Sequence, residues 1–152
     1  MVDPSGARVA RLTTALAAQP AELPLLQALA AAHTQFLLTN LPEVASLVRL
    51  GRSSPALRRR WLTSLEVFEP EVIGWVCERT SCAPDLLYPR MIAGLALLVA
   101  QLAVERWDPD TSGEQLAQVI HEAYRTAATL AEAPRPPAHR PGCSTSASVH
   151  VV

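Results

Sequence analysis

The most apolar stretch of the chain runs from Met91 to Val104, where Gln101 is the only polar residue. A helix that is apolar on every side has no face suited to water, so all of its faces must be covered. We expect one flank to pack against its own domain and the other to be covered by a partner subunit or a ligand. The stretch is shorter than the ~20 residues of a membrane span, and Arg90 and Glu105 bound it, which favours a buried helix.

Two helices are predicted before residue 40. Asp3 and Pro4 suit the cap and first turn of a short helix, in which apolar residues recur at helical spacing until Pro20 ends it. Pro24 opens a second helix that runs to about residue 38. The positions that share its apolar face are Leu26, Leu29, His33, Phe36 and Leu37.

A third helix is predicted to begin at Asn40. Asn40 and Glu43 resemble a capping box, in which each side chain accepts a hydrogen bond from the other residue's backbone N–H. Val44, Leu47 and Val48 form its apolar side, and Gly51 suits the position just after its end.

A fourth helix opens at Ser54, which suits the cap, and Pro55, which suits the first helical position. Apolar residues at 57, 61, 65, 68, 72 and 76 keep one helical phase across Pro70. A proline inside a helix bends it. Because the phase is kept, we expect one long kinked helix rather than two separate ones.

The central helix is expected at 86–107, capped by Asp85, and Asp108-Pro109-Asp110 then turns the chain. Two overlapping capping boxes begin at Thr111 and Ser112 and open a last helix at 113–131. No segment alternates with the period of a strand. We therefore predict an all-α domain of about five to six helices, with residues 1–20 as a short connector, 21–132 as the domain and 133–152 as a disordered Pro-rich tail.

Composition and motifs narrow the classes of function. The net charge of −1 is too balanced for the basic footprint of a nucleic-acid-binding domain. Cys77, Cys82 and Cys143 are odd in number and widely spread, and no secretory segment precedes them, so we expect a cytoplasmic protein without a disulfide framework. No metal-ligand spacing, nucleophile elbow or Gly-rich phosphate loop occurs, so we predict no cofactor, no metal and no enzymatic activity.

The helix order and several segments resemble the C-terminal regulatory domain of TetR-type transcriptional repressors, most closely the regulators associated with mycofactocin gene clusters. The resemblance covers about residues 8–132. It is carried by RLTTALAAQP (11–20), SPALRRRWLTSL (54–65), APDLLYPRMIAGLALLVAQLAVERWDPD (83–110) and QLAQVIHEAYRTAATL (115–130).

The resemblance implies a homodimer in which helices 86–107 and 113–131 form a four-helix bundle with the same pair of a second subunit. It also implies an apolar effector pocket between helices 24–38, 55–79 and 86–107. The basic helix-turn-helix head of that family has no counterpart before Leu25, so we expect no DNA binding by this chain alone. The alternative is a stand-alone interaction module that forms mixed dimers with a full-length relative.

The expected pocket residues are apolar or aromatic apart from one titratable histidine. They are His33, Phe36, Trp61, Phe68, Val72, Leu87 and Met91. For His33 the plainer interpretation is a core histidine hydrogen-bonded to backbone, and for the aromatic residues it is rings that fill the interior.

The expected dimer interface lies on the last two helices and comprises Leu95, Leu98, Gln101, Leu102, Leu116, Val119, Ile120, Ala123 and Ala127. There Gln101 either pairs with its symmetry mate or bonds to a carbonyl of its own chain.

Five arginines cluster around the start of the fourth helix: Arg49, Arg52, Arg58, Arg59 and Arg60. Arginine binds phosphate well, so an acyl-CoA effector is one candidate for this cluster. A solvated helix face is the plainer explanation, because three consecutive arginines point in three directions.

Overall fold

A computed structural model describes residues 4–132, and every regular element in that range is a helix. The fold class predicted from the sequence is therefore confirmed. In chain order the elements are α1 (Pro4–Ala17), α2 (Leu25–Thr39), α3 (Leu41–Ser53), α4 (Pro55–Ser64), the 3-10 turn η1 (Leu65–Phe68), α5 (Glu69–Thr80), α6 (Leu87–Arg106) and α7 (Gly113–Glu132). The proposed tail at 133–152 lies outside the described residues.

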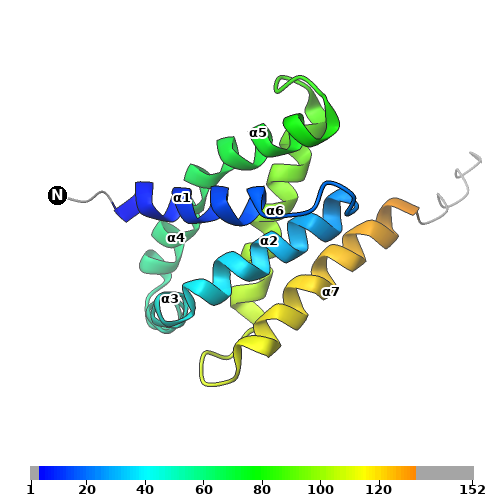
Figure 1. The fold of residues 1–152 in the computed structure, drawn as a ribbon. Helices are drawn as coiled ribbons and strands as arrows, with labels where there is room; N and C mark the ends of the chain where they lie inside the picture. Colours follow the sequence, from blue (N-terminus) through cyan, green and yellow to red (C-terminus); the bar gives the residue numbers. More distant parts are fainter. Residues whose placement is uncertain (1–3, 133–152) are drawn as a thin grey trace, which may run out of the picture.

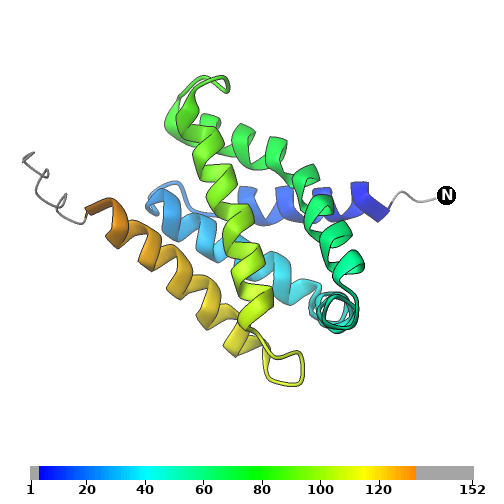
Figure 2. The ribbon, with the colours of Figure 1, turned by 180° about the vertical axis from the view of Figure 1, so that it is seen from behind.

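The central helix α6 crosses α1 and α2, with α5 and α7 packed along it (Figures 1 and 2). Ala93 and Ala103 are fully buried on its inner side, and Ala96 and Ala100 are nearly so. Small side chains there let neighbouring backbones approach closely. α6 is long and apolar enough to cross a membrane by length and composition, a test that the core helices of soluble proteins also pass.

The predicted long helix is wrong in one respect: α4 and α5 are separate α-helices joined by η1. Pro70 lies in the first turn of α5, where its missing N–H has no helical acceptor to lose. Leu65, Phe68 and Val72 are all buried, so the apolar phase continues through the junction. A four-residue 3-10 turn absorbs the bend that the sequence placed at the proline itself.

Helix ends follow the predicted caps only in part. Ser54 caps α4 through its side-chain oxygen, which accepts from the N–H of Leu57 at 3.4 Å. The Asn40 side chain instead donates backwards to the carbonyl of Phe36, at 2.6 Å, and makes no cap for α3. Gly51 lies inside α3, and Leu86 rather than Asp85 precedes α6.

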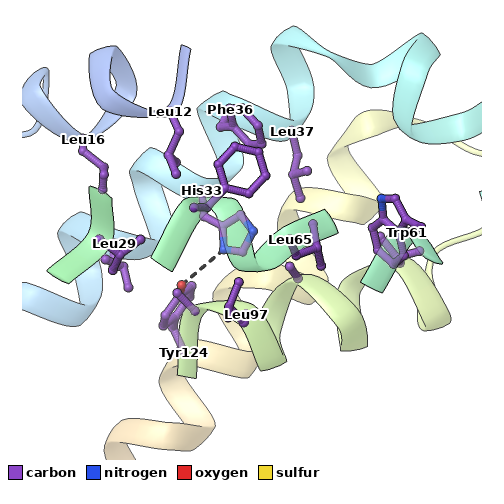
Figure 3. Close-up of a pocket in the computed structure, with 15 residues that line it drawn as sticks. Leu12, Leu16, Leu29, His33, Phe36, Leu37, Trp61, Leu65, Leu97 and Tyr124 are labelled. Carbon is purple, nitrogen blue, oxygen red and sulfur yellow. Dashed lines mark hydrogen bonds between the residues drawn. The ribbon is translucent and has the colours of Figure 1, made fainter. Parts of the chain in front are cut away.

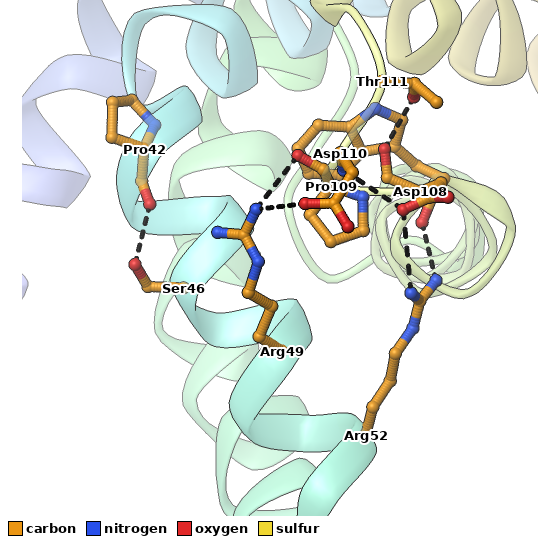
Figure 4. A network of polar contacts seen from close by, with 9 residues as sticks. Pro42, Ser46, Arg49, Arg52, Asp108, Pro109, Asp110 and Thr111 are labelled. Atoms are coloured by element: carbon orange, nitrogen blue, oxygen red, sulfur yellow. Dashed lines mark hydrogen bonds and ion pairs between the residues drawn. The ribbon is translucent and has the colours of Figure 1, made fainter.

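Arginine side chains from α3 hold the turn between α6 and α7 (Figure 4). Arg49 lies 2.7 Å from the carboxylate of Asp110, and Arg52 donates to the carbonyl of Trp107 at 2.9 Å. Trp107 is almost completely buried, and its indole N–H donates to the carbonyl of Ser112 at 3.2 Å. These contacts fix where α7 begins relative to α6.

Candidate ligand cavity and dimer face

An apolar cavity of about 60 Å³ lies at the centre of the helices (Figure 3). Helices α1, α2, α4, α5, α6 and α7 and the turn η1 all contribute to its walls. In the figure Trp61 lies at one end of the group of side chains, and Leu16 and Leu29 lie at the other. The lining consists of Leu12, Leu16, Leu29, His33, Phe36, Leu37, Trp61, Leu65, Phe68, Val72, Ala96, Leu97, Ala100, Val104 and Tyr124.

One polar pair interrupts this lining. Nδ1 of His33 lies 3.2 Å from the hydroxyl oxygen of Tyr124, and the two rings meet edge to face with centroids 6.1 Å apart. Desolvation lowers the pKa of His33 to about 4 and raises the pKa of Tyr124 above its ordinary value. Both groups are therefore neutral near pH 7, and an uncharged imidazole and phenol share one hydrogen bond.

Five of the seven predicted pocket residues meet at this cavity: His33, Phe36, Trp61, Phe68 and Val72. Phe36 and Phe68 pack edge to face, with ring centroids 5.4 Å apart.

Leu87 and Met91 do not line the cavity, which corrects the prediction for these two residues. They are 72% and 62% exposed, because they lie in the first turns of α6.

The sequence reasoning missed Tyr124, the second polar member of the lining. Tyr124 lies four residues after Ile120 and eight after Leu116, so it continues their inward-facing stripe on α7. Helical spacing could have identified it.

A second hollow, of about 450 Å³, lies between α2 and α7 on the other side of Tyr124. Its lining includes the polar side chains of Gln27, His121 and Arg125. Tyr124 borders both spaces, the apolar inner cavity and this more polar hollow. Tyr124 itself is only 2% exposed.

The outer sides of α6 and α7 form an apolar groove of about 370 Å³. Leu98 is 49% and Leu102 37% exposed within it. Of the predicted interface residues, the groove holds Leu95, Leu98, Leu102, Val119, Ala123 and Ala127.

Leu116 and Ile120 are corrections to the predicted interface, because both are fully buried against their own chain. The apolar stripe of α7 is thus two adjacent stripes, one facing inward and one facing outward. Gln101 is partly exposed and lies outside the groove lining.

The arginine cluster is largely committed to ion pairs within the chain. Arg58 pairs with Glu105, in addition to the contacts of Arg49 and Arg52 with the α6–α7 turn. Arg59 and Arg60 are exposed on α4. Within residues 4–132, no three His, Cys, Asp or Glu side chains come together in a way that could hold a metal ion.

Comparison with known proteins supports the family suggested by this architecture. A protein-family model described as the MftR C-terminal domain matches residues 23–131, well over half of the chain. No curated protein matches the chain. The matched region spans α2 to α7 and contains most of the cavity lining and all of the outer groove. The chain therefore belongs to the TetR-type regulators, as a C-terminal regulatory domain of the mycofactocin-regulator subfamily.

Proposed function

We propose that this domain binds an apolar small-molecule effector in the central cavity and forms a homodimer through the outer groove of α6 and α7. The observation that carries the ligand role is an apolar cavity with a single neutral polar pair, His33 and Tyr124, in its wall. Small-molecule sites usually have such a composition, a mostly apolar lining with few polar groups. TetR-type regulators are in general cytoplasmic, and we place this protein there too.

The size of the chamber bears on the kind of ligand. A volume of about 60 Å³ is well below that of most ligand pockets, so binding requires the chamber to expand. Rotation of the Tyr124 ring would join the chamber to the groove between α2 and α7, at the cost of its hydrogen bond to His33. We therefore expect an elongated effector, with an apolar part inside and a polar end near Gln27 and Arg125.

An acyl thioester such as an acyl-CoA has this form. Its phosphates are less well matched to the arginines of α3 and α4, because Arg49, Arg52 and Arg58 already pair with Asp110, with the α6–α7 turn and with Glu105.

Exposed apolar surface on α6 and α7 supports the proposed dimer. Leu98, Leu102 and Leu130 are large apolar side chains with 37% to 71% of their surface exposed along one groove. Contiguous exposed apolar surface is characteristic of protein interfaces. TetR-type C-terminal domains generally dimerise, and this groove is continuous along the two helices concerned.

The ligand role is tested by thermal unfolding of the full chain with long-chain acyl thioesters and fatty acids. A ligand that binds only the folded state raises Tm as its concentration exceeds Kd. The Ala100→Leu variant fills the chamber and should abolish the rise, whereas Ala10→Leu, on the exposed side of α1, should retain it. Equal stabilisation of both variants would place binding elsewhere and contradict the proposal.

The dimer role is tested separately, by sedimentation at micromolar protein. A monomer at that concentration contradicts the homodimer. Co-expression with a head-bearing relative tests the alternative function, because abundant mixed dimers are expected from an interaction module and not from a self-pairing sensor.

A further inference from the structure

Two cysteines meet at the corner between α5 and α6, away from both the cavity and the outer groove. Cys77 lies in the last turns of α5, and Cys82 follows the helix by two residues. Their Sγ atoms are 3.7 Å apart, and both residues are partly buried. The Thr80 hydroxyl donates to the carbonyl of Val76 at 2.7 Å, and its oxygen lies 3.1 Å from Sγ of Cys82.

The backbone brings the two sulfurs together. Ser81, which ends α5, has φ 54°, and it is the only non-glycine residue among those described that has a positive φ. A left-handed residue at this place reverses the chain at the end of a helix. Cys82 is thereby turned back over the last turn of α5, next to Cys77. A serine seldom adopts this conformation, so its neighbours must hold it there.

We propose that Cys77 and Cys82 form a reversible redox site, at which a hydroperoxide oxidises the two thiols to an intramolecular disulfide. The sulfur of Cys82, as thiolate, attacks the terminal oxygen of the hydroperoxide; the O–O bond breaks, leaving a sulfenic acid on Cys82 and releasing water when the peroxide is H₂O₂. The sulfur of Cys77 then attacks the sulfenic sulfur, an S–S bond forms, and a second water leaves. Two thiols lose two electrons, and the peroxide gains them.

The order of the two thiols follows from their surroundings. Burial raises the pKa of Cys77, and the adjacent Cys82 and Asp85 raise it further. Since the thiolate is the reactive form, Cys77 suits the second step, in which it resolves the sulfenic acid rather than meeting the peroxide.

The disulfide would stiffen the corner between α5 and α6, where the loop from α1 to α2 also makes contact. Arg79, between the two cysteines, donates to the carbonyls of Pro20 and Leu23 in the loop from α1 to α2, at 2.7 Å in the case of Leu23. Closing a short loop between Cys77 and Cys82 removes freedom from the unfolded chain. Oxidation should therefore raise Tm.

The test uses the full chain with Cys143→Ser, so that the third thiol cannot react. After stoichiometric H₂O₂ we expect both remaining thiols to become unreactive, the intact mass to fall by about 2 Da, a 77–82 cross-linked peptide to appear, and dithiothreitol to reverse all three changes. Adding Cys77→Ser should instead leave a trappable sulfenic acid on Cys82. The proposal is overturned if both thiols stay titratable under peroxide, or if disulfides form only between molecules.

A separate pair of variants tests whether the left-handed backbone of Ser81 brings the two sulfurs together. Ser81→Gly keeps the left-handed turn available and should oxidise at the original rate, whereas Ser81→Val disfavours it and should slow disulfide formation roughly tenfold. Equal rates for the two variants would contradict the assignment of the turn as the element that pairs the sulfurs. Ser81 is exposed, so neither change disturbs the core.

Discussion

The hydroxyl of Tyr124 on α7 lies 3.2 Å from Nδ1 of His33 on α2 and joins two helices across 91 residues of sequence. Tyr124→Phe keeps the ring and removes this hydrogen bond, which leaves the His33 nitrogen without its partner inside an apolar wall. We expect a loss of about 1–2 kcal/mol in the free energy of unfolding, measured by urea titration. Tyr88→Phe is the matched control, because Tyr88 is about half exposed on α6. A similar loss in both variants would mean that the His33 contact contributes nothing of its own.

The burial of His33 in this pair predicts that the stability of the fold depends on pH. Desolvation holds the pKa of His33 at about 4 in the folded chain, against 6.5 when it is exposed. Between these values the unfolded chain binds a proton that the folded chain does not, so stability falls as the pH drops from about 6.5 towards 4. The loss amounts to at most about 3 kcal/mol, and the partial exposure of His33 reduces it further.

Urea titrations between pH 7.5 and pH 4.5 measure this slope. His33→Gln should flatten it, because glutamine does not titrate. His121→Gln should retain it, since His121 is exposed on α7. A slope that survives in His33→Gln would assign the pH dependence to other groups.

Helical spacing predicted which residues lie inside more reliably than where helices end. Leu65, Phe68, Val72 and Val76 are buried as their phase required, although a 3-10 turn divides the helix. Spacing alone cannot distinguish a kinked helix from two helices in phase. Asn40 shows the limit of cap signals: its side chain donates to the carbonyl of Phe36 in α2 and does not cap α3.

The errors at the site are tertiary in origin. Leu87 and Met91 have the same apolar character as the rest of α6, and only the packing of α5 and α7 determines which turns of that helix are covered. Leu116 and Ile120 share the amphipathic stripe of α7 with Val119 and Ala123. The packing of α7 against α2 and α6 divides that stripe into an inner and an outer half, and helical spacing alone does not say which half faces inward.

The outer groove of α6 and α7 yields a prediction about assembly. Replacing both Leu98 and Leu102 by Glu places two like charges in the apolar groove of α6 and α7. A dimer that covers this groove would have to bury unpaired carboxylates, so we expect a monomer by sedimentation at micromolar protein. Leu57→Glu, on the exposed side of α4, should leave the dimer unchanged. Dimers that persist in the double variant would move the interface away from this groove.

Gly113 tests the packing at the start of α7, and Gly74 on α5 serves as the comparison. A Cβ added at Gly74, on the exposed side of α5, meets no atom within 4 Å. Gly74→Ala should therefore stabilise the chain by about 0.5–1 kcal/mol, because alanine loses less backbone freedom in a helix. At Gly113 the same atom would lie 2.7 Å from Cδ2 of Leu38 and 3.2 Å from Cδ2 of Leu41.

Both leucine tips must move to admit a methyl group at Gly113, so Gly113→Ala should show no gain and a loss of up to about 1 kcal/mol in urea titrations. The contrast between the two variants depends on the junction of α2 and α3 lying directly against the first turn of α7. That placement rests on Arg49 and Arg52, which hold the α6–α7 turn against α3. Adding Arg49→Ala and Arg52→Ala should loosen the turn and shrink the penalty at Gly113, while the gain at Gly74 stays the same. If Gly113→Ala stabilised the otherwise unchanged chain as much as Gly74→Ala, α7 would not begin where these contacts place it.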